Sequence, residues 1–295
     1  MKVWITVGVI LVIVGIALFL WAMFSSSWDF SRLETSKCIT NTHVIDESFT
    51  VISVDTVTAD VVLLPSEGDE CRVECYEYEK AKHSVSAGRG TLRIELEDNR
   101  AWYEHIGLHT DKPKITVYLP EREYSSLSVE GTTGDVNVGA LRFGSIDVDV
   151  TTGDISIYAS AQGEVDAETT TGDISLKDMS ASDIEVSNTT GDITLDGVRC
   201  RDLETEGRTG DLIMKDVIAS GSLTDNRTTG DVKLDGCDAG EINISVTTGS
   251  ITGTLLTPKV FSAESNTGRV TVPKNTEGGR CKLSATTGSI KIEIK

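Results

Sequence analysis

Residues 151–157 read Thr-Thr-Gly-Asp-Ile-Ser-Ile, and close copies of this segment recur through the second half of the chain. The copies place a glycine at intervals of 19 or 20 residues, at Gly134, Gly153, Gly172, Gly191, Gly210, Gly230, Gly249, Gly268 and Gly288. Thr directly precedes every one of these glycines. So constant a period indicates a repeat architecture, in which each unit is one small element that packs on its neighbours.

Apolar residues alternate with polar ones on both sides of the glycine. Ile155 and Ile157 follow one of the glycines, and Ile146 and Val148 precede it. A period of two on both sides of a glycine predicts two short strands joined by a turn, and glycine permits the positive φ of such a corner. No stretch after Ser125 has an apolar period of 3.6 residues, which excludes a helical or leucine-rich repeat.

Equivalent strands of successive units can stack about 4.8 Å apart and pair their backbones. The sequence therefore predicts an all-β fold, a single-stranded parallel β-solenoid of 19–20-residue coils, which the crossover rule makes right-handed. The regular solenoid is predicted over 131–295, and 46–130 is interpreted as degenerate N-terminal coils and a cap, with Ala59 at the glycine position. Residues 98–112 show no clear period and are interpreted as a surface insertion or part of the cap.

The N-terminus predicts a membrane anchor. Val3 to Phe24 is uncharged and, at 1.5 Å per residue, spans roughly 33 Å as a helix, so one transmembrane α-helix is predicted within an anchor of residues 1–28. A cleavable signal peptide is the alternative. A juxtamembrane linker follows over 29–45. The weak charge bias at Lys2 predicts a cytoplasmic N-terminus, with the solenoid extracellular at the cell membrane.

The composition limits the partners. The chain has 46 Asp and Glu against 27 Lys and Arg, a net charge of -19, which argues against nucleic acid as a partner. Aromatic residues make up 5% of the chain, so the coil interior must be filled by aliphatic side chains.

The repeats resemble those of the "putative adhesin" β-solenoid domains of bacterial envelope proteins, which carry a Thr-Gly-Asp-[Ile/Val] signature. The resemblance runs from about residue 49 to 295 and includes Ala59-Asp60-Val61-Val62 and Tyr118-Leu119-Pro120. It implies an envelope protein, often with a membrane helix, and it brings no catalytic residues. Three units depart from the signature, with Ser250, Arg269 and Ser289 after the glycine.

Two sets of acidic residues are candidate sites. The first follows the glycines and comprises Asp135, Asp154, Asp173, Asp192, Asp211 and Asp231. The hypothesis favoured for this column is a structural role, with each Asp accepting a backbone hydrogen bond at the turn; cation binding, for example of calcium, is the weaker alternative. The second set lies before the glycines and comprises Asp147, Asp149, Asp166, Glu168, Glu185, Glu204 and Glu206. It is interpreted as a solvated face, with a basic partner as the alternative.

Histidines and cysteines add no catalytic pattern. His105 and His109 are spaced like a helical metal pair, but a glycine lies between them and a third ligand is missing, so a loop is the favoured interpretation. Cys237 and Cys281 occupy apolar repeat positions and are predicted to be buried, whereas Cys38 is the candidate for an intermolecular bond. Self-association through the solenoid ends is a further possibility. The predicted last edge carries Lys291, Glu293 and Lys295 as charged guards against stacking.

The sequence thus predicts a non-enzymatic, membrane-anchored scaffold at the cell surface or envelope, adhesin-like, which needs no cofactor. Its partner is predicted to be a protein or another envelope component. The alternative is a regulatory or envelope-stress component that acts through a membrane partner. A polysaccharide-active β-helix enzyme ranks third, because the carboxylates are spread along columns rather than gathered in a groove.

Overall fold

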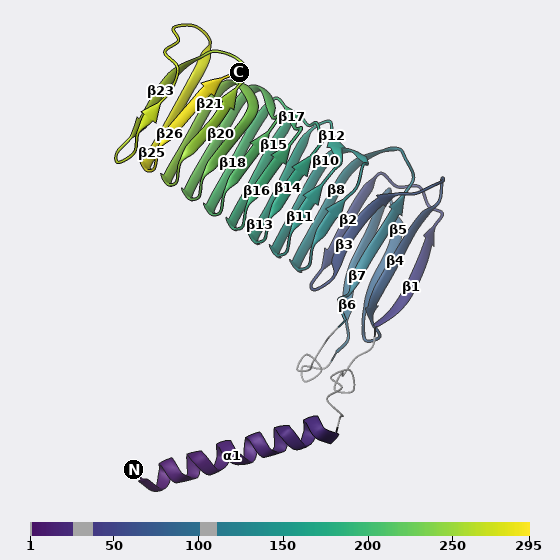
Figure 1. The fold of residues 1–295 in the computed structure, drawn as a ribbon. Coiled ribbons are helices and arrows are strands. Elements are labelled where there is room, and N and C mark those ends of the chain that lie inside the picture. The colour runs from purple at the N-terminus through teal and green to yellow at the C-terminus, as the bar shows by residue number, and fades with distance from the viewer. Residues whose placement is uncertain (1, 26–37, 101–110) are drawn as a thin grey trace.

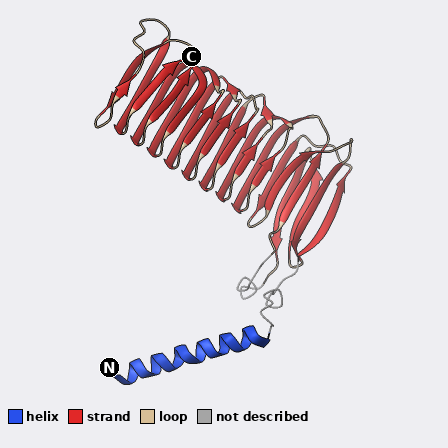
Figure 2. Cartoon of the chain, viewed as in Figure 1, coloured by secondary structure: helices blue, strands red, loops and turns tan. Residues whose placement is uncertain are grey.

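The computed structural model describes residues 2–25, 38–100 and 111–295 of the chain. The described part contains one helix, α1 (Lys2–Ser25), and 26 strands that wind into a long stack of coils (Figures 1 and 2). The predicted parallel β-solenoid is confirmed, while its handedness stays a prediction. His105 and His109 lie outside the described residues, as do 29–37 of the predicted linker.

Helix α1 covers the segment predicted to span a membrane. Within the described residues, however, no helix is long and apolar enough to cross a bilayer, so the predicted transmembrane span is not supported.

Two long ladders of strands form opposite sides of the coil. The first ladder runs, in spatial order, β5 (Ala81–Gly88), β6 (Thr91–Asp98), β2 (Val51–Thr56), β8 (Glu123–Thr133), β10 (Arg142–Thr152), β13 (Glu164–Thr171), β15 (Asp183–Thr190), β18 (Asp202–Thr209), β20 (Ile218–Thr229), β21 (Val232–Thr248), β25 (Gly279–Thr287) and β23 (Lys259–Ser265). From β6 onward its neighbouring strands are parallel.

The second ladder is built from the strands that follow the turns. Its order is β1 (Cys38–Ile45), β4 (Cys71–Tyr78), β7 (Lys114–Leu119), β3 (Asp60–Pro65), β9 (Val136–Val138), β11 (Ile155–Ile157), β14 (Ile174–Lys177), β16 (Ile193–Asp196), β19 (Leu212–Lys215), the start of β21, β22 (Ile251–Leu255), β26 (Ile290–Ile294) and β24 (Val270–Thr271). The short strands β12 (Ser160–Ala161) and β17 (Arg199–Cys200) lie on a third, narrower side.

The coils stack in register, so identical positions form columns. Ile155 pairs with Ile174, which pairs with Ile193, and all three side chains are fully buried. Aromatic rings enter the core mainly near one end, where Tyr124 lies 6.0 Å from Phe49 and 5.7 Å from Phe143 between ring centroids. The aliphatic interior predicted from the shortage of aromatics is therefore present.

The N-terminal end is closed by antiparallel strands. β4 pairs antiparallel with both β1 and β7, and β5 pairs antiparallel with β6. The linker predicted over 29–45 is wrong for residues 38–45, because they form β1, which is paired along its whole length. The alternation of apolar residues in β1 is weak and its side chains are at most half-buried, so this strand depends on its partner rather than on its own pattern.

The order of coils in space differs from the order in the sequence at both ends. Near the N-terminus, the coil of β2 and β3 lies between the coil of β6 and β7 and the coil of β8 and β9. Near the C-terminus, β25 lies between β21 and β23, and β26 lies between β22 and β24. The final stretch of the chain is thus inserted one coil before the end.

This insertion corrects the predicted C-terminal edge. Lys291 lies where β26 is paired on both sides, so it does not guard an edge. Glu293 lies beyond the reach of β24, where β22 is the one partner of β26 among the described strands, and Lys295 follows it, so the guard role stays a prediction for these two residues. The edge of the first ladder is β23 instead. A constant period sets the register of each coil but does not say in which order equivalent coils stack, because neighbouring coils offer the same pairing pattern.

Each turn requires glycine because of its neighbour in the stack. Gly172 has a φ of +150°, and a Cβ added to it would lie 1.9 Å from the carbonyl oxygen of Gly153. In the next coil, a Cβ added to Gly191 would lie 2.0 Å from the carbonyl oxygen of Gly172. The carbonyl oxygen of one turn therefore occupies the place where the next turn would carry a side chain.

Replacing Gly172 by Ala should destabilise the solenoid by about 3 kcal/mol, because the new Cβ meets rigid backbone and the φ is unfavourable. The free energy of unfolding in urea measures this change. The control is Gly131→Ala, whose Cβ would have its nearest neighbour at 3.8 Å and which should stay within about 1 kcal/mol of the parent. Equal losses in both variants would contradict the close stacking of the turns.

Candidate interaction surface

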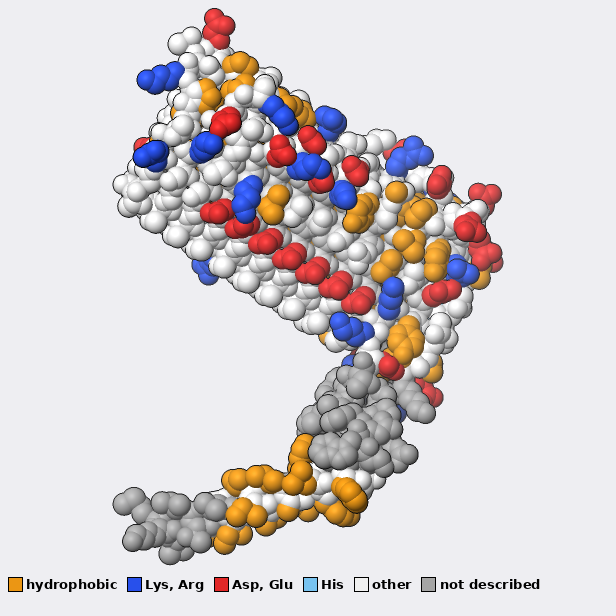
Figure 3. Space-filling view, viewed as in Figure 1, with side chains coloured by type: hydrophobic (Ala, Val, Ile, Leu, Met, Phe, Trp, Pro, Cys, Tyr) orange, Lys and Arg blue, Asp and Glu red, His pale blue; other side chains and the backbone are white. Residues whose placement is uncertain are grey.

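The Asp column is a continuous hydrogen-bonded ladder. Oδ1 of Asp135 accepts the backbone N–H of Asp154 at 3.0 Å, and Oδ1 of Asp154 accepts that of Asp173 at 2.8 Å. The same bond links each later member, Asp192, Asp211 and Asp231, to the one before it. Figure 3 shows acidic side chains in such a row along the stack of coils. The backbone role predicted for the column is therefore the one seen, with the N–H supplied by the next coil.

The ladder also explains the units that lack Asp. It begins at Asp60, a member not counted from the sequence, and ends when Asp231 accepts the N–H of Ser250 at 2.9 Å. Ser250 then accepts the N–H of Ser289, and Ser289 that of Arg269, through their hydroxyls. Arg269 lies in the terminal coil, where no further N–H follows, so an acceptor is no longer needed there.

The cation alternative for this column gains no geometric support. One oxygen of each Asp is engaged by backbone, and Asp211 also accepts from Lys233 Nζ at 2.8 Å. Within the described residues, three or more potential metal ligands converge only at Cys75, Glu77 and His83, far from the column in sequence.

A second group of carboxylates lies on the outward side of the first ladder. The acidic face comprises Glu130, Asp147, Asp149, Glu164, Asp166, Glu168, Asp183, Glu185, Asp202, Glu204 and Glu206. Strand register sets Asp147, Asp166, Glu185 and Glu204 directly beside one another, about 4.8 Å apart. The sequence singled out seven of these residues and missed Glu130, Glu164, Asp183 and Asp202.

Few cations compensate this face. Among the described residues the ion pairs of its carboxylates involve only Arg201, which contacts Asp183 and donates from Nε to Asp202 Oδ2 at 2.7 Å. The Ser222 hydroxyl and Arg201 lower the pKa of Asp202 to about 2. Partial burial, together with the surrounding carboxylates, raises the pKa of Asp166 to about 6. The face thus holds its negative charges close together at a cost in free energy.

Replacing Asp166 by Asn should raise the free energy of unfolding at pH 7 and low salt by about 1 kcal/mol, since each neighbouring charge costs roughly 0.9 kcal/mol at this spacing in water. The pKa of Asp166 is raised in the folded chain, so the folded state takes up the proton first as the pH falls. The penalty is therefore present above about pH 6 and is relieved between pH 6 and the ordinary value of 3.8, where the gain from Asn should vanish.

Urea unfolding at pH 7 and pH 4.5 measures this difference. Asp196→Asn is the control, because Asp196 accepts from Lys215 at 3.3 Å and its removal should not stabilise the chain. A gain of the same size in both variants would contradict repulsion at Asp166.

A groove of about 670 Å³ borders the acidic face. It is lined by residues that include Glu168, Asn188, Glu206, Arg208 and Arg227. Arg208 replaces the first Thr of the Thr-Thr-Gly turn, which happens in only two of the nine units. One of these two irregular units therefore lines the groove.

Beneath the groove lies a buried ion pair. Arg227 and Asp225 have fully buried side chains, with Arg227 Nη2 3.4 Å from Asp225 Oδ1, which also accepts from the Thr205 hydroxyl at 2.8 Å. The guanidinium lies where a side chain at position 207 would be, since a Cβ on Gly207 would come within 2.3 Å of Nη1. Burial raises the pKa of Asp225 to about 6, against the opposing effect of Arg227.

This pair was missed in the sequence although a signal was present. Positions 225 and 227 correspond in register to Ile244 and Val246 of the next coil, so two charges stand where that coil carries aliphatic residues. Arg227 Nη1 donates to the carbonyl of Gly210 at 3.0 Å, as Asn188 Nδ2 does to that of Gly191 at 2.7 Å. These inward polar groups therefore bond the carbonyls of the turns.

Single replacement of Asp225 or Arg227 by Val should each cost about 3 kcal/mol, because an unpaired charge remains buried. The double replacement should cost clearly less than the sum, since Asp225 Oδ2 and Arg227 Nε lack partners among the described residues and two valines would pack against Ile244 and Val246 of the next coil. A double-mutant cycle in urea measures the coupling. Additive losses would show that the two charges do not depend on each other.

The cysteines of the described residues form no disulfide. Cys237 and Cys281 are buried, as predicted, and so are Cys71, Cys75 and Cys200, whereas Cys38 is half-buried. Burial raises the thiol pKa of Cys237 to about 11 and that of Cys281 to about 12. These thiols therefore stay protonated and are poor nucleophiles at neutral pH.

Residues 49–293 match the model of the Toastrack family, DUF4097. The chain belongs to this family. A crystal structure of a "putative adhesin" from Bacteroides fragilis has a TM-score of 0.51 and 17% identity, over 87% of this chain and 97% of that one. A "putative lipid binding protein" from Parabacteroides distasonis has a TM-score of 0.56 and 16% identity, over 86% of this chain and 96% of that one. No curated protein matches the chain significantly.

These comparisons bear on the predicted resemblance. They agree with it on the family of folds and on neighbours named as adhesins, but they do not confirm the Thr-Gly-Asp signature as the mark of that family. At identities this low the similarity to solved structures establishes the fold alone.

Proposed function

We propose that this Toastrack chain is a non-enzymatic interaction scaffold that binds a cationic partner through the acidic face. The observation that carries the proposal is the column of Asp147, Asp166, Glu185 and Glu204, held side by side by strand register. The repulsion within this column is present in the free protein. A partner that supplies Lys or Arg side chains relieves it and gains affinity from that relief.

The rigidity of the scaffold supports this role. Each strand that presents the face is bonded to a strand on either side, and the side chains beneath it, such as Val148 and Val186, are fully buried. The carboxylates therefore keep their spacing without the partner, so little entropy is lost when it binds.

The described residues favour binding over catalysis. A hydroxyl, an imidazole and a carboxyl group do form a chain of hydrogen bonds. Thr56 Oγ1 lies 3.0 Å from His83 Nε2, and His83 Nδ1 lies 2.9 Å from Glu77 Oε2. The Thr56 residue is only 3% exposed, so a substrate cannot reach its hydroxyl. The accessible carboxylates of the two columns are spread along the stack of coils rather than gathered around a nucleophile.

An envelope location belongs to the same proposal, and the neighbour named an adhesin is consistent with it. The acidic face would repel anionic lipid headgroups, which favours a basic protein segment over a membrane surface as the partner. A regulatory role through helix α1 stays the alternative predicted from the sequence.

Binding of the full chain to a lysine homopeptide tests the proposal. Combined replacement of Asp147 by Asn, Glu185 by Gln and Glu204 by Gln should weaken binding at least tenfold at low salt and reduce the salt dependence. The matched control removes the same charge from the exposed loop before β4, through Glu67→Gln, Asp69→Asn and Glu70→Gln, and should change the affinity less than threefold.

Equal weakening in the two triple variants would mean that only net charge matters and would overturn the acidic face as a site. Chemical cross-linking from the acidic face in cells, compared with the same control, then identifies the natural partner.

A further inference from the structure

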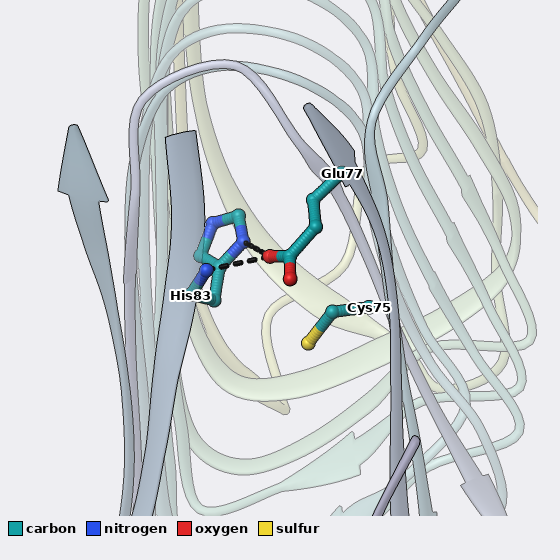
Figure 4. A group of neighbouring side chains, drawn as sticks. All are labelled: Cys75, Glu77 and His83. Atoms are coloured by element: carbon teal, nitrogen blue, oxygen red, sulfur yellow. Dashed lines mark hydrogen bonds and ion pairs between the residues drawn. The ribbon is translucent and has the colours of Figure 1, made fainter. Parts of the chain in front are cut away.

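A buried polar cluster lies inside the antiparallel cap. Cys75 and Glu77 are on the inner side of β4, His83 is on β5, and the hairpin at 78–81 joins these strands across the two ladders. Figure 4 shows the three side chains converging in the space between the strands. A sulfur, a carboxylate oxygen and a ring nitrogen lie within 4.8 Å of one another, and all three residues are buried.

Three donors surround the carboxyl group of Glu77. Oε1 accepts from Asn41 Nδ2 at 2.6 Å, and Oε2 accepts from the backbone N–H of His83 at 2.5 Å. Oε2 also lies 2.9 Å from His83 Nδ1. The carboxyl oxygens thus face hydrogen-bond donors in a residue that is only 1% exposed, which is a setting that suits a bound cation.

His83 has a partner that suits either tautomer. Its Nε2 lies 3.0 Å from the hydroxyl of Thr56. A hydroxyl can donate to an unprotonated nitrogen or accept from a protonated one. The proton of His83 can therefore move from Nδ1 to Nε2 without leaving a buried polar atom unpaired, which frees Nδ1 for another bond.

Cys75 is the member that the hydrogen bonds leave out. Its thiol is fully buried and has no hydrogen-bond partner among the described residues. Burial and the charge of Glu77 raise its pKa to about 12, so it is a neutral thiol in the absence of a metal.

We propose that Cys75, Glu77 and His83 bind one zinc ion. Thiolate, imidazole and carboxylate are the three kinds of ligand that zinc takes from proteins. Two anionic ligands balance the charge of the ion, so the occupied cluster is neutral, as a buried site requires. Glu77 Oε2 and His83 Nδ1 are 2.9 Å apart and would separate slightly around the ion, whereas the Cys75 sulfur, within 4.8 Å of them, must move inward by about 1 Å to form a bond of about 2.3 Å.

Zinc binding releases one proton from the cluster. The Cys75 thiol releases its proton to solvent as the zinc–sulfur bond forms, and Glu77 binds as a carboxylate. His83 binds through Nδ1 while its proton passes to Nε2, which then donates to Thr56. One proton is released per ion, and a water molecule takes the remaining tetrahedral position.

The expected role of the ion is to fasten the cap. It would cross-link β4 to β5, and hence the end of one ladder to the end of the other, in a region where the core is closed by antiparallel strands rather than by a further coil. This site is independent of the acidic face.

Metal binding by the full chain tests the site. Titration of the metal-free protein with zinc should show about one bound ion and about one proton released, and cobalt in place of zinc should give a thiolate-to-metal charge-transfer band. Cys75→Ser should weaken zinc binding at least 100-fold. The control is Cys71→Ser, which removes another buried thiol from the same strand but outside the cluster and should bind as the parent does.

Thermal unfolding gives a second readout. Zinc should raise the Tm of the parent and of Cys71→Ser, a chelator should reverse the rise, and Cys75→Ser should not respond. The cobalt spectrum of the parent decides the question even if Cys75→Ser fails to fold. Less than a tenth of an equivalent bound, a cobalt complex without the thiolate band, or unchanged affinity in a folded Cys75→Ser would each overturn the proposal.

Discussion

The contact on which the solenoid depends is the stacking of one glycine turn on the next. At Gly172 the carbonyl oxygen of Gly153 fills the place of a side chain, and the N–H of Gly172 donates to the carbonyl of Thr190 in the following coil at 2.9 Å. The adjoining N–H of Asp173 is taken by the Asp154 carboxylate. Because both N–H groups at the corner are paired with neighbouring coils, the corner has one alignment, and the strands on both sides share that register.

This alignment determines where the charges lie. Each Asp of the ladder accepts a backbone N–H of the next coil, so this column stabilises the stacking of the coils. The carboxylates of the acidic face do not form such a ladder. Asp183 and Asp202 pair with Arg201, and strand register places the others side by side. The same turn explains the buried polar groups, since Asn188 and Arg227 reach glycine carbonyls from inside the coil. Two acidic columns that look alike in the sequence therefore have different roles.

The exchanged order of the last coils explains why some units lack Asp after the glycine. The residue after each glycine needs an acceptor only when another coil follows in space. Ser250 and Ser289 still provide one, and Arg269 does not, because its coil is the last of the stack although it is not the last of the chain. At the other end, the antiparallel cap encloses Cys75, Glu77 and His83, three residues that no repeat pattern connects.

The sequence by itself determined the repeat, the two strands of each coil, the inward and outward faces and the aliphatic core, because these follow from a period of 19 or 20 residues and from alternation within it. It also indicated seven residues of the acidic face. The tertiary structure decided the order of the end coils, the pairing of β1, the use of each Asp, and the meeting of β4 with β5. Those features depend on which backbone group has a partner in the neighbouring coil, and equivalent coils carry the same local pattern whichever neighbour they have.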